Sequence, residues 1–120
     1  MRRTIKVFIA GVYQREDSKA IVEESQRLCE KYGFELANDG ERYWDILFAI
    51  RACDVVIANY NINQGTLSDG ETEIEVGMAA MAGKKIYAYY SNTDLGQISN
   101  VAIAPVILIE GSFEDCLRAI

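Results

Sequence analysis

The 120-residue sequence contains no histidine, and this absence removes several classes of enzyme from consideration. Histidine is the base in Ser-His-Asp and Cys-His sites, and it binds the metal in most catalytic zinc sites. Any proton transfer must therefore use carboxylates, tyrosine, lysine or the substrate itself.

Three further features that are absent or rare exclude other classes of protein. No apolar run reaches the roughly 18 residues of a membrane-spanning helix, so we expect no membrane contact. The net charge is −6 and no basic patch is visible, which argues against nucleic acid as a partner. Only three cysteines are present, Cys29, Cys53 and Cys116, and they are far apart in the chain. This usage favours reduced, packed thiols in a cytoplasmic protein.

What the sequence does contain is an alternation of strand and helix patterns. Half of the residues are hydrophobic, so one domain covering residues 1–120 can bury its own core. Short apolar, β-branched runs predict strands at 4–11, 34–37, 54–60, 84–90 and 106–110. Helical spacing predicts helices at about 17–32, 43–53, 68–85 and 112–120, the last with Ser112 as its cap and Asp115 in the acidic position of a capping box.

This alternation predicts an α/β fold. Five strands at this length indicate a flavodoxin-like, doubly wound parallel sheet with helices on both faces. Ligands of such folds bind beyond the carboxyl ends of the strands, where loops begin near Gly11, Ala37, Asn59 and Tyr90. Asp54 lies at a strand entrance, away from that end, and is expected to be structural.

The stretch SDGETEIEVGMAAMAGKK, residues 68–85, places Asp69, Glu71, Glu73 and Glu75 within seven residues at the start of an apolar helix. A capping box formed by Ser68 with Glu71, together with the helix dipole, accounts for the first acids. It does not account for Glu75. Glu75 is predicted to lie among small side chains at the ligand end of the fold, and this position favours a functional role over a structural one.

A helical wheel gives the expected orientation of this helix. Ile74, Met78 and Met81 cluster on one side, which we expect to face the sheet, with Glu75 at its border. Val76 and Ala80 then make the outer side apolar, which indicates a contact between subunits.

The run SDGETEIEVGMAAMAGK resembles the signature of the nucleoside 2-deoxyribosyltransferase family. The family's nucleophilic glutamate matches Glu75, and its partner aspartate, six residues earlier, matches Asp69. KVFIAG resembles the family's first strand and its glycine loop, which contains Gly11, and ACDVVIAN resembles its third strand. The resemblance also includes the closing helix, GSFEDCLRAI, and so covers nearly the whole chain.

The resemblance implies an enzyme of nucleotide salvage that moves 2-deoxyribose between nucleobases. Glu75 would trap the oxocarbenium-like sugar as a covalent ester, and a second base would attack it with net retention. Asp69 would hold a proton near the departing base. The partners implied are a nucleoside or nucleotide and a free nucleobase, with no metal and no cofactor.

Two positions in the substrate site depart from the family's pattern. Phe8 occupies the place of a first-strand tyrosine whose hydroxyl orients the nucleophile. Tyr13, in the following loop, either substitutes for that tyrosine or has an ordinary packing or surface role. Asp45 is either the family's base-contacting aspartate, displaced by one residue, or a plain charge at a helix start.

Asn100, in the segment GQISN, matches an asparagine that reaches into a neighbouring subunit's site, which implies a homo-oligomer, a dimer or higher. The alternative is that Asn100 only turns a loop. Two other functions stay open. One is an N-glycosidase that hydrolyses 2-deoxynucleoside 5-monophosphates, with Arg15 and Arg42 either contacting the phosphate or exposed to solvent; the other is a non-catalytic nucleotide-binding domain.

Overall fold

The five strands form one sheet in which every pair is parallel. A computed structural model describes residues 4–12, 17–38, 43–61, 70–92 and 105–120, with residues 43–45 and 70 described by their backbone alone. The strands are β1 (Lys6–Ile9), β2 (Glu35–Leu36), β3 (Val55–Asn59), β4 (Lys85–Tyr90) and β5 (Ile107–Glu110). Their order, β2-β1-β3-β4-β5, confirms the predicted flavodoxin-like sheet.

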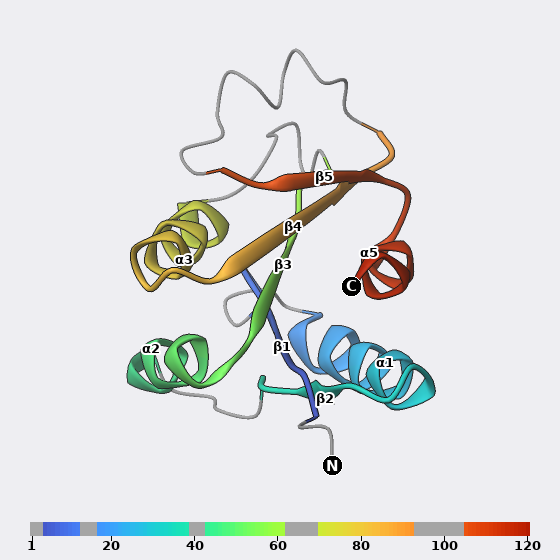
Figure 1. Ribbon diagram of the computed structural model, residues 1–120, viewed down its shortest axis with the longest axis horizontal. Coiled ribbons are helices and arrows are strands. Elements are labelled where there is room, and N and C mark those ends of the chain that lie inside the picture. Colours follow the sequence, from blue (N-terminus) through green and yellow to red (C-terminus); the bar gives the residue numbers. More distant parts are fainter. Residues whose placement is uncertain (1–3, 13–16, 39–42, 62–69, 93–104) are drawn as a thin grey trace.

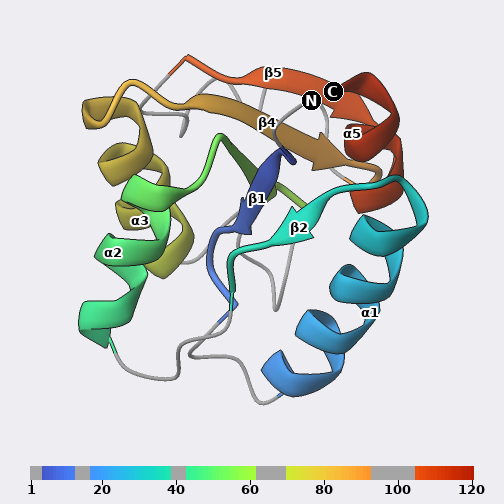
Figure 2. The same ribbon diagram turned by 60° about the horizontal axis from the view of Figure 1, so that its bottom comes forward.

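Helices cover both faces of this sheet. The helices are α1 (Ser18–Lys31), α2 (Tyr43–Ala52), α3 (Gly70–Met81) and α5 (Phe113–Ala119). Figures 1 and 2 show α2 and α3 on one face and α1 and α5 on the other. Among the described residues, no helix is long and apolar enough to cross a membrane.

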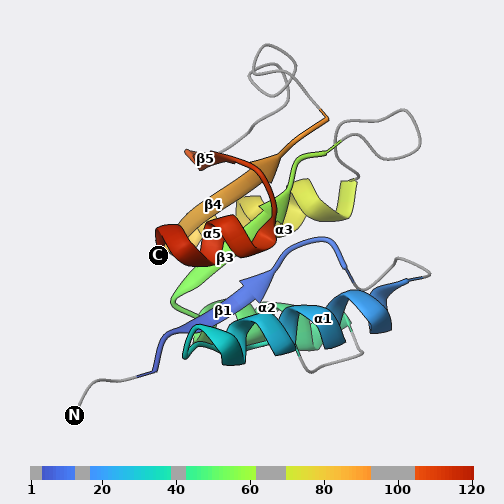
Figure 3. The same ribbon diagram turned by 90° about the vertical axis from the view of Figure 1, so that its right-hand side faces the viewer.

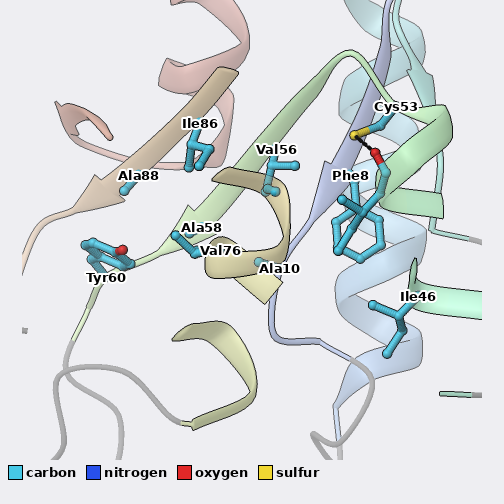
Figure 4. Close-up of a cluster of buried hydrophobic side chains, with 12 residues drawn as sticks. Phe8, Ala10, Ile46, Cys53, Val56, Ala58, Tyr60, Val76, Ile86 and Ala88 are labelled. Carbon is cyan, nitrogen blue, oxygen red and sulfur yellow. Dashed lines mark hydrogen bonds between the residues drawn. The ribbon is translucent and has the colours of Figure 1, made fainter. Parts of the chain in front are cut away.

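Each layer of helices encloses its own apolar core against the sheet. The core below α2 and α3 includes Phe8, Ile50, Val56, Tyr60, Val76 and Ala79 (Figure 4). The core below α1 and α5 includes Val7, Ile57, Cys29, Phe113 and Leu117. Strand β3 contributes to both because its residues Val55–Ala58 are all buried, as is typical of a central parallel strand.

The thiols belong to these cores. Cys29, Cys53 and Cys116 are all free and buried, which confirms the prediction of reduced, packed cysteines. Burial raises the pKa of Cys29 and Cys53 to about 11 and that of Cys116 to about 12. These thiols are therefore protonated at neutral pH and chemically quiet.

At the amino end of the sheet, Asp54 joins β1 to β3. Its carboxylate Oδ2 accepts a hydrogen bond from the Lys6 backbone N–H at 2.9 Å, and its own N–H donates to the Lys6 carbonyl at 2.8 Å. The expectation of a structural role for Asp54 agrees with this geometry.

A cluster of polar side chains joins α5 to the end of α1. Glu114 Oε2 accepts hydrogen bonds from Lys31 Nζ at 2.8 Å and from the Tyr32 hydroxyl at 2.7 Å. The bond from Lys31 is the main reason that the pKa of Glu114 falls to about 2. The predicted capping box of α5 is also present, since the Ser112 N–H donates to Asp115 Oδ2 at 2.8 Å.

Candidate active site

The carboxylate of Glu75 is buried where α3 meets the carboxyl end of β1. Glu75 is only 2% exposed, although it is a charged residue type. Its Oε1 accepts a hydrogen bond from the Gly11 backbone N–H at 3.1 Å. Figure 3 shows the start of α3 and the carboxyl end of β1 at the same edge of the molecule. Glu75 therefore lies at the ligand end of the fold, as predicted, and its catalytic role stays a prediction.

Glycine is the only residue type that fits at position 11. Its φ of +80° lies in the left-handed region, which side chains rarely adopt. A Cβ built on Gly11 would overlap Thr72 Oγ1 and would lie 3.0 Å from Thr72 Cβ. The glycine therefore allows the first turns of α3 to approach the β1 backbone closely, and this approach brings Glu75 within hydrogen-bonding distance.

The buried face of α3 differs from the face that the helical wheel predicts. Thr72, Glu75, Val76 and Ala79 are buried, whereas Ile74 is 54% and Met81 is 92% exposed. The assignment of Ile74 and Met81 to the sheet side was wrong, and so was the assignment of Val76 to an outer, subunit-facing side. The helix is apolar on nearly every side, so apolar periodicity could not fix its rotation. The rotation of α3 is instead set by the contacts of Thr72 and Glu75 with Gly11, at the end of β1.

Four large apolar side chains are exposed on the helix layer formed by α2 and α3. They are Leu47 and Phe48 on α2 and Ile74 and Met81 on α3.

Two more acids of the predicted cluster lie at the start of α3. Glu71 and Glu73 are half-buried in its first turn, where the helix dipole favours negative charge. Glu73 lies close to Tyr60, which follows β3 and is fully buried. Burial, with a smaller contribution from the Glu73 carboxylate, raises the pKa of the Tyr60 hydroxyl above its ordinary value. Tyr60 therefore stays neutral and can act only as a hydrogen-bonding group.

Phe8 is placed in the core and is 0% exposed. Figure 4 shows its ring beside Ile46 and Cys53, on the α2 and α3 side of the sheet. Its apolar ring has no hydroxyl to offer Glu75, whereas the Gly11 N–H donates to Glu75 Oε1. A role for Phe8 in substrate binding stays a prediction.

The remaining predicted site residues are not described at the level of their side chains. Asp45 is the third residue of α2, and only its backbone is described. Tyr13, Asp69 and Asn100 lie outside the described residues. Their roles stay predictions.

Sequence reasoning missed two asparagines at the carboxyl edge of the sheet. Asn38 is 3% exposed; its Oδ1 accepts from the Ile9 N–H at 2.7 Å and its Nδ2 donates to the Ile9 carbonyl at 2.9 Å. Asn61 makes a similar side-chain connection between the ends of β3 and β4. In both cases the available signal was an asparagine directly after a predicted strand, at the edge where ligands bind.

The described arrangement suits nucleophilic catalysis. A buried carboxylate is costly unless it is hydrogen-bonded, and strongly desolvated acids in such positions are commonly functional. The Gly11 N–H holds one oxygen of the Glu75 carboxylate at the end of β1. Within the described ranges, no group of three or more acidic or cysteine residues could hold a metal ion.

Comparison with known proteins identifies the family of the chain. The chain matches the family described as "Nucleoside 2-deoxyribosyltransferase" over residues 7–104. No curated protein sequence matches it.

Solved structures share the fold. A CMP N-glycosidase from Clostridium botulinum is 24% identical, with a TM-score of 0.62, over 95% of this chain and 96% of that one. A 2-desoxiribosyltransferase from Leishmania mexicana is 20% identical, with a TM-score of 0.66, over 96% of this chain and 95% of that one. A de novo designed Rossmann 2x3 protein is 17% identical, with a TM-score of 0.55, over 98% and 85%.

One natural protein is named as an N-glycosidase and the other as a 2-desoxiribosyltransferase, whereas the third protein is a designed one. At these identities the likeness establishes the α/β Rossmann-like fold. The family match shows more than the fold, because residues 7–104 include most of β1, Gly11, and the whole of α3 with Glu75. The chain belongs to the nucleoside 2-deoxyribosyltransferase family.

Proposed function

We propose that this protein is a nucleoside 2-deoxyribosyltransferase that moves 2-deoxyribose from one nucleobase to another. The observation that carries the proposal is the buried Glu75 carboxylate, held by the Gly11 N–H at the ligand end of the sheet. A nucleophile that forms a sugar ester needs a carboxylate in one fixed orientation, shielded from water. The Gly11–Glu75 hydrogen bond supplies that orientation.

The reaction proceeds in two displacements. A Glu75 oxygen forms a bond to the anomeric carbon as the C–N bond breaks, and the bonding pair leaves with the base. Asp69 protonates the departing base, so that the base leaves as a neutral molecule. A nitrogen of the second base then attacks the same carbon and releases the Glu75 carboxylate, while Asp69 takes up the proton. Two inversions give net retention.

The sugar has no 2-hydroxyl group, and this lowers the activation barrier that the site must overcome. A 2-hydroxyl withdraws electrons and destabilises the oxocarbenium-like transition state, so a 2-deoxyribosyl group reaches that state more easily. The negative charge of Glu75 stabilises the positive charge that develops on the sugar. The acidic residues at the start of α3, Glu71 and Glu73, add to the negative potential at this edge.

A second candidate is an N-glycosidase that transfers the sugar to water. It would share the first displacement, including the Glu75 ester, and would differ only in the molecule that attacks the ester. The fold likeness to a CMP N-glycosidase keeps a nucleotide substrate in consideration. A third candidate, a non-catalytic nucleotide-binding domain, would retain the fold without the ester.

One incubation separates these candidates. The protein is mixed with deoxyinosine and adenine, and the products are resolved by chromatography, with a deoxynucleoside monophosphate tested in parallel. New deoxyadenosine supports transfer, whereas free deoxyribose or deoxyribose phosphate supports hydrolysis. The Glu75→Gln protein is the matched control, because its amide oxygen can still accept the Gly11 N–H. Product from neither substrate, or equal product from Glu75→Gln, would contradict the proposal.

A further inference from the structure

The side chain of Asn38 takes the place of a strand residue beside the end of β1. Strand β2 ends at Leu36, and one further backbone hydrogen bond to β1 follows, from the Ala37 N–H to the Val7 carbonyl at 2.8 Å. The Asn38 amide then bonds to both backbone groups of Ile9. Its Oδ1 accepts from the Ile9 N–H at 2.7 Å, and its Nδ2 donates to the Ile9 carbonyl at 2.9 Å. The amide therefore extends the β2 side of the sheet by one more step.

Both residues in this contact are buried, so the contact is costly to lose. Ile9 is 2% exposed and Asn38 is 3% exposed. A buried backbone N–H or carbonyl that loses its partner cannot turn to water for a replacement. Replacing Asn38 with alanine would take away the partner of the Ile9 N–H and the partner of the Ile9 carbonyl at the same time.

The peptide unit between Ile9 and Ala10 is held at both of its polar groups. Its carbonyl, from Ile9, accepts from Asn38 on the β2 side, and its N–H, from Ala10, donates to the Ile57 carbonyl of β3 at 2.9 Å. A peptide unit is planar, so these two hydrogen bonds fix its orientation. Only the two backbone dihedrals of Ala10 separate this unit from the N–H of Gly11. Asn38 and β3 therefore set the position from which the Gly11 N–H points.

We propose that Asn38 is a positioning residue for the reaction: through the peptide unit that it binds, it places the Gly11 N–H that holds the Glu75 carboxylate. The proposal rests on the proposed function, in which Glu75 is the nucleophile. Asn38 acts through the end of β1 and does not touch the reacting atoms. Without the Asn38 amide, the peptide unit keeps only its bond to β3, and Glu75 loses its fixed place. A nucleophile displaced by about 1 Å loses on the order of 10²-fold in rate.

Steady-state kinetics test this role. Asn38→Ala removes both hydrogen bonds to Ile9, and we expect kcat to fall roughly tenfold to 100-fold because the nucleophile is less well placed. KM for the nucleoside should stay within about threefold of the wild-type value, since the Asn38 amide is bonded to the β1 backbone. A loss in kcat without a matching rise in KM is the expected signature.

Asp54→Ala is the matched control for a merely structural effect. Asp54 also binds the β1 backbone, since its Oδ2 accepts from the Lys6 N–H at 2.9 Å, but it does so at the opposite end of the strand from Gly11. Asp54→Ala should destabilise the fold as Asn38→Ala does. Its kcat should stay within about twofold of wild type when rates are measured below both melting transitions.

Asn38→Asp is a second variant of nearly the same shape as the natural side chain, and it keeps the fold even where Asn38→Ala does not. Its carboxylate accepts the Ile9 N–H but has no hydrogen to donate to the Ile9 carbonyl. The peptide unit is then held at β3 alone. We therefore expect Asn38→Asp to lower kcat as well, by at least about threefold.

The amide signal of Gly11 gives a readout that does not depend on activity. In protein labelled with nitrogen-15 glycine, the Gly11 amide proton should move upfield in Asn38→Ala and in Asn38→Asp, towards its position in Glu75→Ala, where the acceptor is absent. It should stay in place in Asp54→Ala. The internal reference is Gly83, whose N–H donates to the Ala80 carbonyl at 3.1 Å beyond the end of α3.

Each result decides one of the two proposals. An active wild type whose kcat is unchanged in both Asn38 variants, or falls equally in Asp54→Ala, would overturn the positioning role. A wild type that neither transfers nor hydrolyses would overturn the proposed function. In that case a Gly11 signal that stays in place in both Asn38 variants would still overturn the placement of the Gly11 N–H by Asn38.

Discussion

The backbone N–H of Gly11 donates a hydrogen bond to Glu75 Oε1 at 3.1 Å, across 64 residues of sequence. This contact joins the end of β1 to the second turn of α3. The pattern of the family that the sequence resembles has a first-strand tyrosine, whereas this sequence has Phe8 there, and Phe8 is buried. Apart from proline, which has no backbone N–H, no substitution at position 11 removes this donor. It can be displaced only by moving the chain.

The first prediction is that Glu75 forms the covalent intermediate. Glu75→Ala should lower turnover by on the order of 10³-fold or more while the fold is retained, because the nucleophile is removed. Mass spectrometry of the wild type with a 2-fluoro-2-deoxynucleoside should find the sugar adduct on Glu75. An adduct on another residue, or an active Glu75→Ala protein, would contradict the assignment.

A second prediction uses two glycines with the same backbone conformation. Gly11 and Gly33 both have φ of +80°, but only Gly11 has Thr72 in the space that a Cβ would fill. Gly11→Ala should displace α3, destabilise the fold by about 1–3 kcal/mol and reduce activity strongly. Gly33→Ala should lose only about 1 kcal/mol from backbone strain and keep its activity. Thermal melts and initial rates check both, and equal activities would show that the close approach at Gly11 is not needed.

The third prediction is that Asp69 protonates the departing base. Asp69→Asn should slow reaction with poor leaving bases far more than reaction with an activated base, because only the poor base needs a proton to leave. The measurement is kcat/KM for a series of nucleosides that differ in the pKa of the base. Equal losses across the series would point to a helix-capping role alone.

The fourth prediction concerns acid stability. The pKa of Glu114 lies near 2 in the folded protein, below its ordinary 4.5, so its ionised form is favoured by folding. Its contribution to stability is therefore complete above pH 4.5 and is lost as the pH falls towards 2. Glu114→Gln should be less stable than wild type in urea at about pH 7, and the difference should shrink as the pH approaches 2.

A matched variant tests the cause of that effect. Lys31→Ala removes the main partner of Glu114 and should reproduce most of the pH-dependent difference. A difference between Glu114→Gln and wild type that stays constant from about pH 7 down to about pH 2 would contradict the ion-pair explanation.

The fifth prediction is that active sites are shared in a homo-oligomer, with Asn100 completing a neighbour's site. The apolar surface available for assembly includes Phe48, which is 76% exposed on α2, and Met81 on α3, in place of the Val76 side that the helical wheel indicated. Glu75→Ala and Asn100→Ala proteins, each inactive alone, should regain part of the activity when co-assembled. A fully active monomer in sedimentation, or inactive mixtures, would exclude a shared site.

The sequence by itself determined the fold class and the position of Glu75 at the ligand end of the fold. Apolar runs such as that of β3 and the helical pattern of α1 are local signals, and each predicted element was found with only its ends displaced. The parallel arrangement of the strands follows from the alternation of strands and helices, because parallel strands are joined by right-handed helical crossovers. Glu75 stands out in the sequence because it is the acid of its cluster that no capping rule explains.

Only the tertiary structure decided how α3 is rotated and what holds Glu75. Because α3 is apolar on nearly every side, its sequence carries little information about which side is buried, and Ile74 and Met81 were placed on the wrong side. The fit of Thr72 against Gly11 sets that rotation. Likewise, the oxygen of Asn61 meets Ser91 across 30 residues. Such contacts depend on which strand ends become neighbours in space, and no periodicity within a single element encodes that.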